Sequence, residues 1–231
     1  MYLGLPGLRG FWPMSSVAYT NPQCLDISGN GLHLTNVNVA QFGTDGLPPY
    51  VDVDGVNQHL LHADGGAANA FDVTGTETYI TAAQRGLTIG GWFRPDAVAA
   101  SFLIGKVGGV GTYSYWLQQT APIQFEVSVD GTAVTSVGGT NPIISTWRFI
   151  VGTFAPSTEL AIFIDDEVKA VNVAGIPASI FDSASNFVIG ANSGGVTLFN
   201  GKASMCFLCA ALVPDATIGS LYQQTRRMYG R

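Results

Sequence analysis

Acidic residues occur in short groups at several places in this chain. Glycoside hydrolysis needs two carboxyl groups, one on each side of the scissile bond. Asp52 and Asp54 share one face of a predicted strand, but a turn glycine follows them and no glutamate completes the spacing. Residues 165–167 are consecutive acids at a predicted hairpin turn. We therefore expect no enzyme, with catalysis or metal binding by Asp52 and Asp54 as the minor alternative.

A calcium site is a second candidate for the acidic residues. Asp26, Ser28 and Asn30 present alternating oxygens in a tight turn, and hard cations prefer such ligands. The favoured alternative is an Asx turn that closes a hairpin without any ion. Asp26 and Asn30 are the candidate metal ligands, and we expect no other cofactor.

Histidines, cysteines and a glycine-rich segment offer weaker signals. His59 and His62 lie near Asp64 and suggest a metal site or, alternatively, the edge of a solvated loop. No G-x-S-x-G motif accompanies the histidines. Residues 105–109 lack the spacing of a phosphate-binding loop.

The three cysteines cannot all pair within one chain. Cys206 and Cys209 are three positions apart in an apolar run, so on a strand they point to opposite faces. A zinc site would need two more ligands nearby. We predict buried free thiols.

Aromatic residues cluster at Tyr113, Tyr115 and Trp116, just after a glycine-rich loop. By strand alternation Tyr113 and Tyr115 share one face and Trp116 takes the other. Stacking against a saccharide is one use of such rings, and core packing is the commoner use. These three residues are candidate ligand contacts.

The charge balance excludes nucleic acid as a partner. The net charge is −6, whereas binding to a phosphate backbone requires a basic surface. The basic residues Arg226, Arg227 and Arg231 cluster near the end of a predicted helix. They either complement the helix dipole or form a docking tail for an acidic partner, so Arg226 and Arg227 are candidate partner contacts.

Composition points to a surface that is covered by neighbours. Only 11% of residues are charged, against about 25% in ordinary globular domains. No apolar run approaches the roughly 20 residues of a membrane helix, so we expect no membrane partner. The N-terminal segment lacks the features of a signal peptide. We expect cytoplasmic folding and burial in a homo-oligomer or larger assembly.

Alternating apolar patterns predict an all-β chain. Residues 62–86 are predicted as a long loop, in which 78–85 form a short helix or an extra strand, and 215–228 as a C-terminal helix. We predict one domain over residues 1–231. The strands are expected at 8–14, 50–55, 56–61, 87–95, 101–107, 112–119, 123–129, 133–137, 147–154, 160–164, 187–190 and 202–212, with a turn between 50–55 and 56–61.

Several segments, taken in order, resemble the laminin G-like, concanavalin A-like lectin/glucanase jelly rolls. Residues 8–14 are similar to the opening L-x-G-Y-W-P-L strand of that family, 26–31 to its D-x-S-G-N-G loop, and 87–95 to its F-T-I-S-A-W-V-K-P strand. Weaker similarities follow at 51–60, 147, 161–166, 188–191, 199–202 and 211–218. The resemblance implies two antiparallel sheets packed face to face, with a short C-terminal helix.

The resemblance also guides the functional prediction. The strand at 203–209 lacks the carboxylates that accompany calcium in some members, which argues against that route to calcium binding. Jelly rolls of this family occur in phage particles. We therefore predict a non-enzymatic assembly module, a capsid-decoration or tail-associated protein of a virion that binds other virion proteins. The alternative is an extracellular module that binds a cell-surface or matrix glycan.

Overall fold

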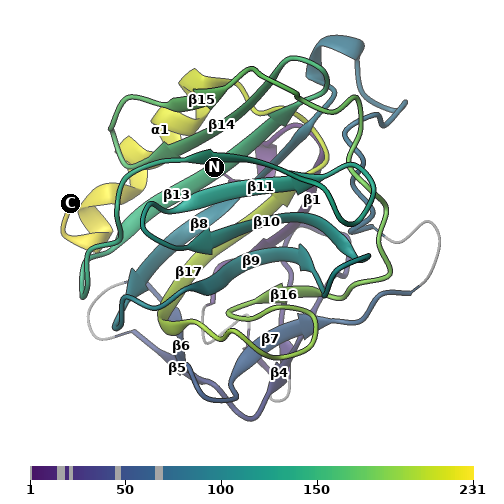
Figure 1. Cartoon of the computed structure of the whole chain (residues 1–231). Coiled ribbons are helices and arrows are strands. Elements are labelled where there is room, and N and C mark those ends of the chain that lie inside the picture. The colour runs from purple at the N-terminus through teal and green to yellow at the C-terminus, as the bar shows by residue number, and fades with distance from the viewer. Residues whose placement is uncertain (1, 15–18, 21–22, 45–47, 66–69) are drawn as a thin grey trace.

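The structure is a computed structural model that describes residues 2–14, 19–20, 23–44, 48–65 and 70–231. This part of the chain forms two antiparallel β-sheets packed face to face, with a short helix near the C-terminus (Figure 1). The predicted jelly-roll sandwich is confirmed. Among the described residues no helix is long and apolar enough to cross a membrane.

Sheet A contains eight strands within the described residues. In spatial order they are β15 (Ala170–Asn172), β14 (Glu159–Ile164), β13 (Arg148–Ala155), β8 (Leu87–Pro95), β17 (Asn200–Cys209), β6 (Tyr50–Asp54) and β5 (Gln41–Gly43), while β1 (Leu8–Trp12) also pairs with β17.

Sheet B contains nine strands within the same residues and faces the viewer in Figure 1. In spatial order they are β12 (Val134–Gly138), β11 (Gln124–Ser128), β10 (Tyr113–Gln119), β9 (Ser101–Val107), β16 (Phe187–Ile189), β7 (His59–His62), β4 (Leu34–Val37), β3 (Gln23–Cys24) and β2 (Tyr19–Thr20). Several of the short strands, such as β4, β5 and β15, escape the sequence pattern because three or four residues are too few to show alternation.

The main core lies between the two sheets, and a second apolar cluster lies on the outer face of sheet A. Helix α1 (Asp215–Thr225), the 3₁₀ turn η4 (Arg226–Tyr229) and the N-terminal 3₁₀ turn η1 (Tyr2–Gly4) contribute to that second cluster. The central strand β8 is therefore apolar on both faces: Phe93 points into the main core and Trp92 into the second cluster. Cys206 and Cys209 divide in the same way, as predicted, and all three cysteines are buried and free.

The segment between β7 and β8 is irregular where the structure describes it, except for a 3₁₀ turn η3 (Ala82–Gln84). For residues 78–85 we predicted a short helix or an extra strand, and the structure has this short 3₁₀ turn. The fully buried Phe71 fixes the segment, because its ring stacks on Phe187 with centroids 4.4 Å apart. Gly86 ends it with a positive φ of 151°, and a Cβ there would lie 2.2 Å from the Phe154 carbonyl oxygen.

Candidate functional site

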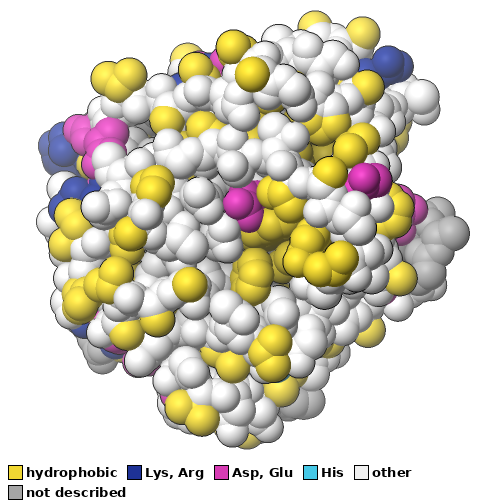
Figure 2. Space-filling model, viewed as in Figure 1, with side chains coloured by type: hydrophobic (Ala, Val, Ile, Leu, Met, Phe, Trp, Pro, Cys, Tyr) yellow, Lys and Arg dark blue, Asp and Glu magenta, His cyan; other side chains and the backbone are white. Residues whose placement is uncertain are grey.

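The outer face of sheet B carries aromatic and polar side chains together over β9, β10 and β11. Strand alternation sends Tyr115 and Leu117 into the core and leaves Trp116 and Gln118 outside. On β11 the same alternation leaves Gln124 and Glu126 outside, directly across from Gln118 and Trp116 in the register. Figure 2 shows apolar side chains gathered over these strands with few charges among them.

Aromatic rings on this face contact one another around Trp116. The Tyr113 ring lies 5.4 Å from Trp116 and the Phe102 ring 6.4 Å from it, centroid to centroid. Trp116 is only 3% exposed, whereas Tyr113 and Phe102 are half-buried. We call Phe102, Tyr113, Trp116, Gln118, Gln124 and Glu126 the aromatic–acid face. In it Trp116 supports two more accessible rings.

The carboxyl of Glu126 is the acidic group of the aromatic–acid face. Burial raises the pKa of Glu126 to about 7, and interactions with Trp116 and Gln118 oppose that shift. The Trp116 indole N–H forms no hydrogen bond of normal geometry. The Gln118 amide donates to the Gln124 side-chain oxygen over 2.9 Å. The face thus offers a carboxyl that exchanges a proton near neutral pH, beside two amides.

Of the three aromatic candidates from the sequence, the structure brings Tyr113 and Trp116 together and removes Tyr115. Tyr115 is fully buried, and its hydroxyl donates to the Phe71 carbonyl oxygen over 2.7 Å. Its prediction as a ligand contact is wrong. The sequence analysis missed Glu126, although the alternation of polar and apolar residues from Gln124 to Ser128 signals an outward carboxyl.

The candidate calcium ligand Asp26 is engaged by the protein. Its carboxylate accepts hydrogen bonds from the backbone N–H groups of Phe11, Ser28 and Leu32 and from the Ser28 hydroxyl, at 2.7–3.0 Å. The Asn30 amide donates to the carbonyl oxygens of residues 8 and 9 at 3.0 and 2.8 Å. The turn is therefore closed by hydrogen bonds, as in the Asx alternative, and calcium binding there stays an untested prediction.

The basic C-terminal residues belong largely to the fold. Arg231 pairs with Asp165 at 2.7 Å, and Asp165 in turn pairs with the buried Arg148 at 2.6 Å. Arg226 is half-buried and Arg227 is exposed. A docking role for Arg226 and Arg227 stays a prediction, and the tail as a whole is attached to sheet A.

The remaining acidic candidates also have structural partners. Asp52 pairs with Lys202 at 3.4 Å, and Asp54 accepts hydrogen bonds from three backbone N–H groups of the following turn. Asp165 and Glu167 both pair with Arg148, and these ion pairs stabilise the turn that was predicted at 165–167. Among the described residues no group of three or more His, Cys, Asp or Glu is arranged to hold a metal ion.

The histidine candidates divide between core and loop edge. His59 is buried, and burial lowers the pKa of its imidazole. The His62 ring packs against Phe71 with centroids 4.8 Å apart. Neither histidine forms a metal site with Asp64 among the residues that can be described, and Asp64 instead faces Lys106.

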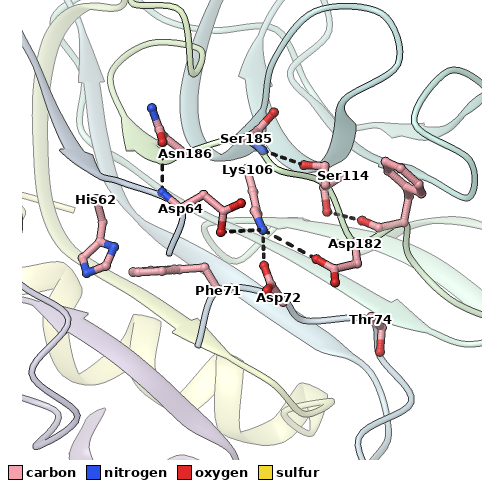
Figure 3. A network of polar contacts seen from close by, with 12 residues as sticks. His62, Asp64, Phe71, Asp72, Thr74, Lys106, Ser114, Asp182, Ser185 and Asn186 are labelled. Atoms are coloured by element: carbon pink, nitrogen blue, oxygen red, sulfur yellow. Dashed lines mark hydrogen bonds and ion pairs between the residues drawn. The ribbon is translucent and has the colours of Figure 1, made fainter. Parts of the chain in front are cut away.

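Lys106 is a buried lysine surrounded by three carboxylates, and the sequence analysis did not predict this cluster. It lies on β9, not in a loop, and its side chain is 1% exposed. Figure 3 shows its amine among the carboxylates of Asp64, Asp72 and Asp182. The sequence signal for this cluster is the lysine within the otherwise uncharged strand β9, because a buried lysine is rare without a charged partner.

Comparison with known proteins agrees with this architecture. A family model described as the concanavalin A-like lectin/glucanases superfamily matches residues 55–205. No curated protein sequence matches the chain.

Solved structures with the same fold have very different sequences. The binding domain of Paraclostridial Mosquitocidal Protein 1 gives a TM-score of 0.69 at 10% identity, covering 97% of this chain and 53% of that one. The receptor binding domain of botulinum neurotoxin C/D mosaic serotype gives 0.69 at 8%, covering 94% and 51%. Domain 4 of AbnA, a GH43 extracellular arabinanase from Geobacillus stearothermophilus, in complex with arabinotriose, gives 0.61 at 11%, covering 95% and 100%.

The coverage differs between these structures. The chain spans about half the length of the two toxin domains and the full length of domain 4. At such low identities the likeness concerns the fold alone.

Proposed function

Since the chain belongs to the concanavalin A-like lectin/glucanase superfamily, we propose that it is a non-enzymatic module that binds a neutral glycan on the aromatic–acid face of sheet B. The observation that carries this proposal is the grouping of Tyr113, Phe102 and Glu126 on a sheet face that no helix within the described part of the chain covers. Aromatic rings stack on the apolar faces of sugars, and carboxyl and amide groups bind their hydroxyls.

The chemistry of the face favours an uncharged sugar. None of its six residues is basic, so an acidic saccharide would find no counter-charge there. The half-buried rings of Tyr113 and Phe102 supply apolar contact, with Trp116 beneath them. Glu126, Gln118 and Gln124 supply hydrogen bonds at one side.

Binding without catalysis is supported by the state of the acidic residues. Asp52, Asp54, Asp165 and Glu167 are engaged in ion pairs or turns. Glu126 has no second carboxylate in its own aromatic–acid face, whereas glycoside hydrolysis uses a pair. We infer an extracellular site of action, at a cell or matrix surface.

Calorimetric titration with soluble neutral oligosaccharides tests this proposal, with arabinotriose as the first probe because it is the ligand named in the domain 4 structure. We expect saturable binding that weakens about tenfold, or ~1.4 kcal/mol, in Tyr113→Ala and in Phe102→Ala. Tyr79→Ala is the control, since Tyr79 is 58% exposed and contacts Arg9 elsewhere. No binding to any neutral glycan on a broad array would refute the proposal.

A role in assembly, including the predicted virion role, is the second candidate, and one observation favours it. Val134, Val168, Val171 and Val173 are 42%, 97%, 47% and 71% exposed. They lie on or beside β12 and β15, which end sheets B and A and contact each other through the Asn172 amide and the Ser136 carbonyl oxygen. Exposed apolar residues on edge strands suit contact with another protein chain.

Light scattering after size exclusion tests the assembly role. A homo-oligomer that dissociates in Val171→Lys or Val173→Lys, with glycan binding unchanged, would support it. If the protein is a monomer at all concentrations, the homo-oligomer is refuted. An assembly role would then require binding to other proteins, and co-purification with virion components tests for that binding.

A further inference from the structure

The lysine–aspartate cluster contains an amine and a carboxyl group held together in a dry part of the sandwich. The side chains of Lys106 and Asp72 are 1% and 8% exposed, and the Lys106 amine donates a hydrogen bond to the Asp72 carboxylate. Opposite Lys106 in the sheet stand Tyr115 on β10 and Phe187 on β16, both buried. The lysine stem therefore lies between aromatic rings, and few water molecules can surround its amine.

The charges of the cluster do not balance. Asp64 and Asp182 each place a carboxylate oxygen 3.8 Å from the Lys106 amine, in addition to Asp72. Three carboxylates and one ammonium leave two negative charges when all are ionised. Protonation of a carboxyl group reduces this excess of negative charge. Amide formation between Lys106 and Asp72 leaves the excess unchanged, but it removes the cost of keeping a poorly hydrated ammonium and carboxylate in the site.

We propose that Lys106 and Asp72 form an intramolecular isopeptide bond, with Asp182 as the proton donor and acceptor. The structure holds the two reacting groups in contact from separate segments, β9 and the loop after β7 (Figure 3). Such positioning raises the effective concentration of two reactants to about 10⁵–10⁸ M. Exclusion of water from the product also opposes its hydrolysis.

The reaction balances without an oxidant, a reductant or a cofactor. The Lys106 ammonium transfers a proton to the Asp72 carboxylate, and the neutral amine attacks the Cγ atom of the neutral Asp72 carboxyl. The C–N bond forms, the Asp182 carboxylate takes the second proton from nitrogen, and it passes that proton to the leaving hydroxyl as the C–OH bond breaks. One ammonium and one carboxylate become one amide and one water molecule.

The surroundings of Asp182 suit this role. Burial raises the pKa of Asp182, and the nearby Asp72 carboxylate raises it further, so this carboxyl holds a proton more readily than an isolated one. Its side chain is 50% exposed, which gives the released water a path to solvent. The bond would join the long loop to sheet B covalently, as a disulfide would in an oxidising compartment.

Intact-mass spectrometry of the denatured wild-type chain is the test. We expect a mass below the sequence mass by one water molecule, and a branched proteolytic peptide that joins residues 72 and 106. Lys106→Arg keeps the positive charge but cannot form this amide, so it should show the full sequence mass. Lys202→Arg is the matched control, because Lys202 pairs with Asp52 in a more exposed ion pair and should leave the water loss unchanged.

Two further variants test the chemistry itself. Asp72→Asn should react with loss of ammonia in place of water, and Asp182→Asn should show the full sequence mass or a slow, partial loss. A cyclic imide at an Asp–Gly pair, such as Asp130–Gly131, would also lose one water. The peptide map and resistance to hydroxylamine separate the two products. A wild-type chain at full mass, or a water loss that maps outside residues 72 and 106, would overturn the proposal.

Discussion

The outer faces of the two sheets use the same kind of residue in opposite ways. On sheet A, Trp92 is fully buried, stacks on Tyr229 with centroids 4.1 Å apart, and donates to the Thr225 hydroxyl over 3.1 Å. On sheet B, Trp116 packs against half-buried rings, and its N–H forms no regular hydrogen bond. The C-terminal segment thus closes one face, and the other remains available.

This difference shows that a tryptophan on the outer face of a sheet can be either covered by the rest of the chain or left available to a ligand. Trp92 is outward with respect to the sheet and interior with respect to the molecule, because α1 and η4 cover it. The chain's own helix therefore occupies the outer face of sheet A, and a ligand of the proposed kind would bind to sheet B.

The largest effect is expected from Trp92→Ala. We expect a loss of about 3–5 kcal/mol of unfolding free energy, because the substitution opens a cavity beneath the helix. Trp116→Ala should cost about 1–2 kcal/mol, since its neighbours are partly exposed. Urea denaturation followed by circular dichroism measures both, and equal losses would contradict the distinction between the two faces.

A smaller effect is expected from Thr225→Val, which preserves shape but removes the acceptor of the Trp92 N–H. The buried donor then lacks a partner, at a cost of about 1–3 kcal/mol. Thermal and urea unfolding measure the change. Ser220→Ala is the matched control on the exposed side of α1, because the Ser220 hydroxyl only bonds the preceding helical turn. A neutral result for Thr225→Val would mean that the helix does not seal this face.

The pH dependence of stability in Glu126→Gln tests whether the Glu126 carboxyl on sheet B is partly buried. The folded pKa of Glu126 is raised from 4.5 to about 7, so its contribution to stability is present below pH 4.5 and is lost as the pH rises to about 7. The difference in unfolding free energy between wild type and Glu126→Gln should therefore change across that window.

Asp130→Asn on the β11–β12 turn is the control of opposite sign. Hydrogen bonds from the backbone N–H groups of Ala133 and Thr132 lower the pKa of Asp130, so its contribution is lost as the pH falls. A flat difference for Glu126→Gln from pH 4.5 to 7 would show that the carboxyl is better hydrated than the structure indicates.

The smallest effect is expected from Arg227→Ala, because Arg227 is exposed. Stability should change by no more than about 0.5 kcal/mol. Arg231→Ala should cost up to about 1 kcal/mol, since it removes an ion pair to the buried Asp165. Differential scanning calorimetry compares the two, and a larger loss for Arg227→Ala would mean that this residue also fastens the tail to sheet A.

The sequence by itself determined the sandwich, the C-terminal helix and the division of Cys206 and Cys209 between two apolar layers. These features follow from local periodicity, which fixes the direction of each side chain within a regular strand. It also determined that the acids at 165–167 form a turn. The resemblance to jelly-roll families added the order of the segments.

Only the tertiary structure decided which aromatic residues face outward. The register of β9 against β10 shifts between Tyr113 and Tyr115, and at this bulge Tyr113 turns to the outer face with Trp116, whereas Tyr115 stays in the core. Pairing between strands sets such a shift, and the pattern within one strand does not reveal it. The cluster around Lys106 joins residues 64, 72 and 182, which only the folded chain brings together, because contacts over such separations depend on how the loops close.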